Sequence, residues 1–140
     1  MKTVSKIVQG MTILIAILVP MSCSTDTPTE PTFVVGAGGN LMNSNLQATI
    51  LKCDLLFDGS VIATANFSQA NGLATLNGTV SSVKKGSHSI SFRITSQTSS
   101  PNTYETVGAN AMAGTSSFHL TDQKKSLATG ESFSFTIDVE

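Results

Sequence analysis

Apolar side chains recur at every second position along most of the chain beyond residue 47. A period of two is typical of strands that bury one face, whereas a helix repeats about every 3.6 residues. The clearest alternating sets are Leu51, Cys53, Leu55 and Phe57; Val61, Ala63, Ala65 and Phe67; His88, Ile90, Phe92 and Ile94; and Phe133, Phe135, Ile137 and Val139. Weaker sets lie near 33–35, 74–80, 104–107 and 117–120. About seven or eight short strands, with no helical stripe, predict an all-β, antiparallel β-sandwich.

Asp58 and Gly59 separate two of these sets and predict a hairpin. A two-residue loop would place apolar residues of one strand opposite Asn66 and Thr64 of the other. A three-residue loop that includes Ser60 gives apolar partners throughout. Those partners are Leu51 with Phe67, Cys53 with Ala65, Leu55 with Ala63, and Phe57 with Val61. The three-residue register therefore agrees better with one buried face.

Three glycines and one alanine fill residues 36–39, directly after the apolar residues Phe33, Val34 and Val35. A glycine-rich loop can bind phosphate when a strand precedes it and a helix follows. Residues 40–47 have neither a helical apolar stripe nor the P-loop lysine. We therefore expect a short strand at 33–35, then a flexible corner, and no phosphate site.

The first 25 residues have the organisation of a secretion signal. Lys2 and Lys6 precede an apolar run over 11–21, and Ser22-Cys23-Ser24 follows it. A membrane-spanning helix is the competing interpretation, but it needs about 20 apolar residues, and polar residues or glycine close this run on both sides. The sequence thus predicts export from the cytoplasm.

Pro20, Met21, Ser22 and Cys23 resemble the lipobox of bacterial lipoproteins, in which an apolar residue and two small residues precede an invariant cysteine. The resemblance implies cleavage before Cys23 and lipidation of Cys23 by fatty acids such as palmitate. The protein would then be anchored in the bacterial cell envelope, at the outer membrane or the cell surface. Acyl chains contribute about 0.8 kcal/mol for each buried methylene. Ordinary cleavage after Ser24 is the alternative, and it would release a secreted domain.

On the lipoprotein interpretation, residues 1–22 are a signal peptide, residues 23–32 a lipidated cysteine with a flexible linker, and residues 33–140 one β-sandwich domain. Residues 24–32 offer no apolar side chain to a core, and in extended form they would hold the domain roughly 25–30 Å from a membrane. Because Lys2 and Lys6 lie in the leader, the mature chain has a net charge of −3. This balance, with no basic stripe, argues against a nucleic-acid partner.

Cys53 is the only cysteine besides Cys23, and a lipidated or removed Cys23 cannot pair with it. A disulfide between the two would require an uncleaved signal. Three fates of Cys53 follow: burial in the core as a small apolar residue, pairing between chains, or reactivity. Reactivity requires an electropositive setting that the sequence does not indicate, so burial is the preferred interpretation.

Residues 83–94 resemble the turn and strand of immunoglobulin-like and fibronectin type III-like modules in bacterial surface proteins, where an apolar residue, a glycine and Tyr or His lead into an alternating strand. The resemblance implies an immunoglobulin-like sandwich in which the ring of His88 fixes a loop. Residues 127–133 are also similar to the glycine-led last strand of jelly rolls, which gives the alternative fold.

Candidate catalytic or metal-binding residues are few. His88 and His119 are the only imidazoles, and with Cys53 they lack the short ligand spacing of a zinc site. Asp54 and Asp58 form too small a cluster for calcium, and no G-x-S-x-G elbow occurs. We therefore expect no cofactor, no metal and no enzymatic activity. A small hydrolase built on paired carboxylates is the alternative.

Polar loops give a better case for binding. If all strands are antiparallel, the loops at 68–72, 96–102 and 121–130 meet at one pole of the sandwich. The ligand-binding candidates in these loops are Gln69, Asn71, Gln97, Asn102, Asp122 and Gln123. Amides can both donate and accept hydrogen bonds to sugars or to a peptide backbone. The sequence thus predicts a non-catalytic module for binding, adhesion or envelope assembly, with a protein or glycan partner; a subunit that adds a strand to a neighbour is a further alternative.

Overall fold

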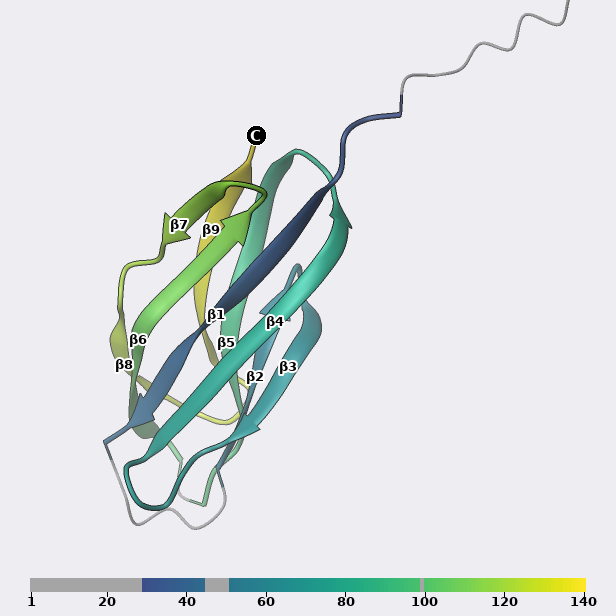
Figure 1. Cartoon of the computed structure of the whole chain (residues 1–140). Helices are drawn as coiled ribbons and strands as arrows, with labels where there is room; N and C mark the ends of the chain where they lie inside the picture. The colour runs from purple at the N-terminus through teal and green to yellow at the C-terminus, as the bar shows by residue number, and fades with distance from the viewer. Residues whose placement is uncertain (1–28, 45–50, 99) are drawn as a thin grey trace, which may run out of the picture.

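The computed structural model describes residues 29–44, 51–98 and 100–140, and these residues form strands and turns (Figure 1). The strands are β1 (Phe33–Asn43), β2 (Lys52–Phe57), β3 (Ser60–Asn66), β4 (Leu73–Val83), β5 (Gly86–Ser96), β6 (Asn102–Ala113), β7 (Ser116–His119), β8 (Lys124–Leu127) and β9 (Ser132–Val139). The leader and the lipobox lie outside the described residues. Within the described ranges, no helix has the length and apolar character needed to cross a membrane.

Two antiparallel sheets pack face to face. The first has the order β4-β1-β6-β7, and β8 also pairs with β6; the second has the order β3-β2-β5-β9. Every pairing is antiparallel. The predicted all-β, antiparallel sandwich is therefore confirmed, with nine strands in the described part of the chain.

The core lies between the two sheets and contains most of the alternating apolar side chains predicted from the sequence, whereas Val61, expected on the buried face, is 50% exposed. Phe92 is fully buried, and Phe135 meets it edge-on, with 6.0 Å between ring centroids. Leu51 and Phe135 are also buried, as predicted. Cys53 has no exposed surface and is a free thiol, so the burial predicted for it is confirmed.

The β2–β3 hairpin combines the two registers that the sequence offered. Cys53 lies opposite Ala65 and Leu55 opposite Ala63, as the three-residue loop predicted. At the tip, however, Phe57 pairs with Ser60 rather than with Val61, so the prediction of a three-residue loop is wrong there. Asp58 and Gly59 form a two-residue turn with φ of 46° and 79°, as in a type I′ turn. A bulge at Ile62 then restores the apolar register.

The prediction of a flexible corner at 36–39 is also wrong, because these residues form the middle of β1 between β4 and β6. Two of their glycines, Gly38 and Gly39, permit close packing. A Cβ on Gly38 would lie 2.8 Å from the carbonyl oxygen of Leu76, and one on Gly39 would lie 2.8 Å from Cα of Ala109. Glycine inside a strand often marks such a close approach or a bulge, and the β1–β6 register does shift between Gly38 and Asn40.

Two other strands differ from the prediction. The strand expected near 104–107 extends over Asn102–Ala113, where the alanines at 109, 111 and 113 face the core. The expected loop at 121–130 contains β8, which pairs with the first residues of β6. Only Leu127 of β8 is buried, so its sequence carries almost no strand pattern.

Candidate functional site

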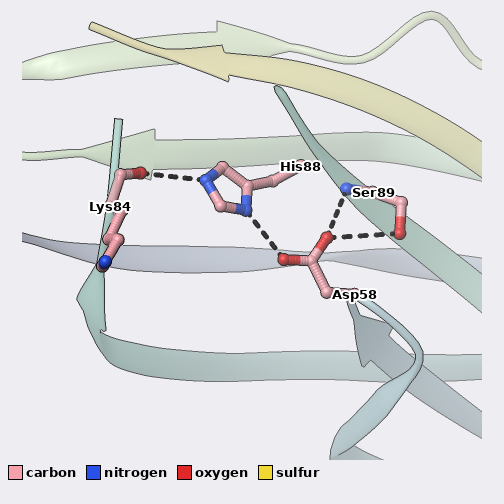
Figure 2. Close-up of polar contacts among 4 residues, drawn as sticks. All are labelled: Asp58, Lys84, His88 and Ser89. Carbon is pink, nitrogen blue, oxygen red and sulfur yellow. Dashed lines mark hydrogen bonds and ion pairs between the residues drawn. The ribbon is translucent and has the colours of Figure 1, made fainter. Parts of the chain in front are cut away.

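Asp58 and His88 form a polar pair where three strand ends meet (Figure 2). Asp58 lies in the type I′ turn between β2 and β3, and His88 lies near the start of β5. The β4–β5 turn brings Lys84 to the other side of the imidazole ring. The ring of His88 also stacks on Phe57, with 5.2 Å between ring centroids, which fixes its plane.

Both nitrogens of His88 contact hydrogen-bond acceptors. Nδ1 lies 2.7 Å from Oδ2 of Asp58, and Nε2 lies 2.9 Å from the carbonyl oxygen of Lys84. Since a carboxylate and a carbonyl can only accept, both nitrogens donate when these bonds form, and the ring is then the cationic imidazolium. The other carboxylate oxygen of Asp58 accepts a hydrogen bond from the backbone N–H of Ser89 at 2.8 Å.

These contacts move the pKa values of His88 and Asp58 in opposite directions. The hydrogen bond to Asp58, followed by that to the Lys84 carbonyl, raises the pKa of His88 above its ordinary value. Partial burial acts to raise the pKa of Asp58, but hydrogen bonds from His88 and Ser89 outweigh it and hold that pKa below its ordinary value. The charged pair is therefore favoured across the mildly acidic range.

This geometry suits a structural role better than proton transfer. A catalytic histidine oriented by a carboxylate keeps its second nitrogen available for a nucleophile or substrate. Here the Lys84 carbonyl occupies that nitrogen. A cleft of about 400 Å³ adjoins the pair, with Phe57, Ile62 and Val80 among its lining residues. The pair therefore joins two hairpin turns at the side of an apolar cleft.

The Asp58–His88 pair should make stability depend on pH. His88 has a raised pKa in the fold, so its contribution is complete below about pH 6.5 and is lost as pH rises through the folded-state pKa. Asp58 has a lowered pKa, so its contribution is complete above about pH 3.8 and is lost as pH falls through the folded-state pKa. Chemical denaturation should show the pair's stabilisation to be greatest between these two values.

His88→Gln should remove this dependence above pH 6 and cost about 1 kcal/mol at pH 5.5. His119→Gln is the matched control, because His119 is exposed at the end of β7 and makes no such pair. A wild-type stability that stays level from pH 6 to 9, or falls equally in both variants, would contradict the assignment.

The structure brings together only two of the three loops that were predicted to meet at one polar pole. Residues 68–72 and the described residues of 96–102 lie at the same end of the sandwich, at the bottom of Figure 1. The two ends of the segment at 121–130 lie in different places. Gln123 lies beside β6, where its backbone N–H donates to Oγ1 of Thr106, whereas Ala128 lies near the pole. Asp122 is exposed next to Gln123, away from the pole.

At the pole, several predicted binding residues bond within the protein. Oε1 of Gln97 accepts hydrogen bonds from Nδ2 of Asn102 at 2.9 Å and from the hydroxyl of Tyr104 at 2.8 Å. Nε2 of Gln97 donates to the carbonyl of Leu127 at 3.2 Å. Asn71 accepts from the N–H of Leu73, which shapes its turn, and Gln69 lies exposed in the same turn. Gln97 thus organises the loop in which it lies.

The remaining titratable candidates do not converge on one site. Burial, and then the charge of Asp54, raises the pKa of Cys53 to about 12, so its thiol stays protonated. Asp54 is buried on β2, where Arg93 contacts it at 3.0 Å. Glu105 lies on the other sheet beside Lys124. Over 29–44, 51–98 and 100–140, no three metal-ligating side chains cluster.

One groove in the described structure was not foreseen from the sequence. It is a groove of about 750 Å³ between β9 and the β6–β7 hairpin, lined by Phe33, Phe118 and residues 136–140 among others. Its position depends on which strands end up at the sheet edges, and periodicity does not report strand order. The one available signal was the unbroken alternation of the last strand, which contains neither proline nor lysine.

Comparison of the chain with protein-family models, with curated proteins and with solved structures found no match.

Proposed function

We propose that this chain is a non-catalytic lipoprotein of the bacterial cell envelope, in which a β-sandwich domain acts in binding, adhesion or envelope assembly. The observation that carries the proposal is the leader, with its basic residues, short apolar run and lipobox-like Ser22-Cys23. The polar residues at 24–32 separate Cys23 from β1, which begins at Phe33, as a spacer between an anchor and a domain would.

The binding role is supported by how the domain uses its polar residues. The Asp58–His88 pair has both ring nitrogens engaged, and the Cys53 thiol is buried and protonated. The carboxylates Asp54 and Glu105 lie on different sheets, each beside a cation, so they do not form the carboxylate pair that a hydrolase would need. A rigid sandwich with accessible grooves and loops is the usual frame for recognition. The immunoglobulin-like resemblance at 83–94 is part of the same proposal.

Lipidation should be read directly from the mature protein. The full chain, expressed in a bacterium that processes lipoproteins, should begin at Cys23 and carry fatty acyl chains, as measured by intact-mass and N-terminal peptide mass spectrometry. Cys23→Ser should abolish metabolic labelling with an alkyne palmitate analogue and release the protein from the membrane fraction, because the acyl chains supply the membrane affinity.

Cys53→Ala is the matched control, since it removes the other cysteine but leaves the lipobox intact. This variant should label like the wild type. A mature protein that begins at Thr25, an uncleaved leader, or labelling that persists in the Cys23→Ser variant would refute the lipoprotein proposal.

A further inference from the structure

The sandwich closes along one side. There β3 and β4, the edge strands of the two sheets, approach each other so closely that a Cβ on Gly78 would lie 2.8 Å from Cγ1 of Ile62. Both strands are also irregular: β3 has its bulge at Ile62, and β4 shifts register near Ser82, whose φ is 60°. Bulges and close cover are common means by which proteins prevent further strands from pairing at an edge.

The opposite side of the sandwich is built differently. β9 is the edge strand of the second sheet, and its eight residues pair with β5 without any shift in register. No strand in the described part of the chain pairs with its outer edge. The facing edge of the first sheet has only the four-residue strands β7 and β8. Lys125 of β8 lies over the ring of Phe133 near the start of β9, whereas a groove borders the C-terminal half of β9, at 136–140.

The groove of about 750 Å³ is lined by residues 136–140 and by the β6–β7 hairpin, beside this stretch of β9. The strands concerned lie in the upper part of Figure 1. Phe33 and Phe118 line it and are only partly buried, so apolar side chains of an incoming strand could cover them. Regular backbone groups on one wall and aromatic side chains on the other are the elements of strand-addition sites.

We propose that the outer edge of β9 binds an extended peptide segment of a partner protein by adding it as a strand to the second sheet. This inference rests on the proposed binding function and gives its partner class. Alternate apolar side chains of the segment enter the groove towards Phe118, and its backbone pairs with residues 136–139. The side chains on its other face lie beside Thr136 and Asp138, which point outward from the sheet.

Charge identifies the segment further. Asp138 and Glu140 are exposed at the groove, and no lysine or arginine lines it. A segment with a basic residue on its outward face therefore complements this edge. A second copy of the chain fits less well, because pairing two β9 edges would bring the same carboxylates into one interface.

The test uses the full chain in mild detergent and a short blocked peptide that alternates valine with threonine or lysine. Isothermal titration should detect binding, and amide exchange should slow at alternate residues of β9, where edge N–H groups otherwise exchange freely. A peptide with glutamate in place of lysine should bind about threefold to fivefold more weakly at low salt. A peptide of equal composition with its valines adjacent should not bind.

Variants locate the site. Asp138→Lys should reverse the preference between the lysine and glutamate peptides, and Phe118→Ala should weaken both by about fivefold to tenfold. Asp122→Lys is the matched control, because Asp122 is exposed outside the groove and should not alter the preference.

Binding with protection at β9 and reversal by Asp138→Lys supports the inference. No binding, binding unchanged by these variants, protection at another strand, or a concentration-dependent dimer through β9 in sedimentation overturns it. The lipidation measurement separates the two proposals: an acylated protein that binds none of the peptides loses the strand-addition site but keeps the lipoprotein assignment.

Discussion

Replacing Phe92 with alanine is expected to lower the free energy of unfolding by about 3–5 kcal/mol, which is a large share of the stability of a small domain. Phe92 lies on β5, between β2 and β9, and its side chain is fully buried. Its ring meets that of Phe135 at an interplanar angle of 90°. Truncation therefore removes buried area, an edge-to-face contact and the packing against β1 together.

Urea denaturation followed by far-ultraviolet circular dichroism measures this loss. Ser91→Ala is the matched control, because Ser91 is the preceding residue of β5 and points away from the core, where its hydroxyl contacts that of Ser134. That control should change stability by no more than about 0.5 kcal/mol. A loss of less than about 1.5 kcal/mol for Phe92→Ala would mean that the two sheets do not enclose this ring.

Much of the sandwich was predictable because alternation determines which face of a strand is buried. The sets around Phe92 and Phe135 point inward as predicted, and Cys53 takes its place among them. The hairpin at Asp58 and Gly59 shows the limit of this reasoning. Periodicity required an apolar partner opposite Cys53, whereas the Asp58-Gly59 dipeptide favoured a two-residue turn. The bulge at Ile62 allows both.

The missed strand segments have little pattern of their own. β8 contributes only Leu127 to the core, and the second half of β6 contributes alanines, which are weak strand formers. Residues 36–39 have almost no side chains at all. Their place in the sheets is set by neighbouring strands, which a pattern along one segment cannot report.

The candidate sites likewise combine features that a local sequence pattern predicts with features that depend on residues far apart in the chain. The resemblance at 83–94 implied that the ring of His88 fixes a loop, but it did not give the partner of the ring, because Asp58 lies 30 residues away and meets His88 only when two turns come together. The groove beside β9 depends on strand order, so it could not be read from alternation. The polar pole was partly predictable, since antiparallel connections alternate ends, yet the internal bonds of Gln97 depend on how the loop folds.

Gly39→Ala is expected to destabilise the domain by about 2–4 kcal/mol, although it adds a single methyl group. Gly39 has a φ of 156° at the bulge where β1 meets β6. A Cβ there would lie 2.8 Å from Cα of Ala109 and 3.3 Å from Cζ of Phe92. The Phe92 side chain could rotate away, but the Ala109 atom in contact belongs to the backbone, so β6 itself would have to move.

Gly36→Ala separates this effect from the general cost of altering a glycine. Gly36 lies on the same strand, with no atom within 4 Å of the position its Cβ would take. The added methyl group there should be neutral or stabilise the domain by about 0.4–1 kcal/mol, because it restricts the unfolded chain. Paired urea midpoints measure the difference. Equal stability of the two variants would show that β1 and β6 are not in close contact at Gly39. If Phe92→Ala relieved the Gly39→Ala defect in full, the ring rather than the Ala109 backbone would be the obstacle.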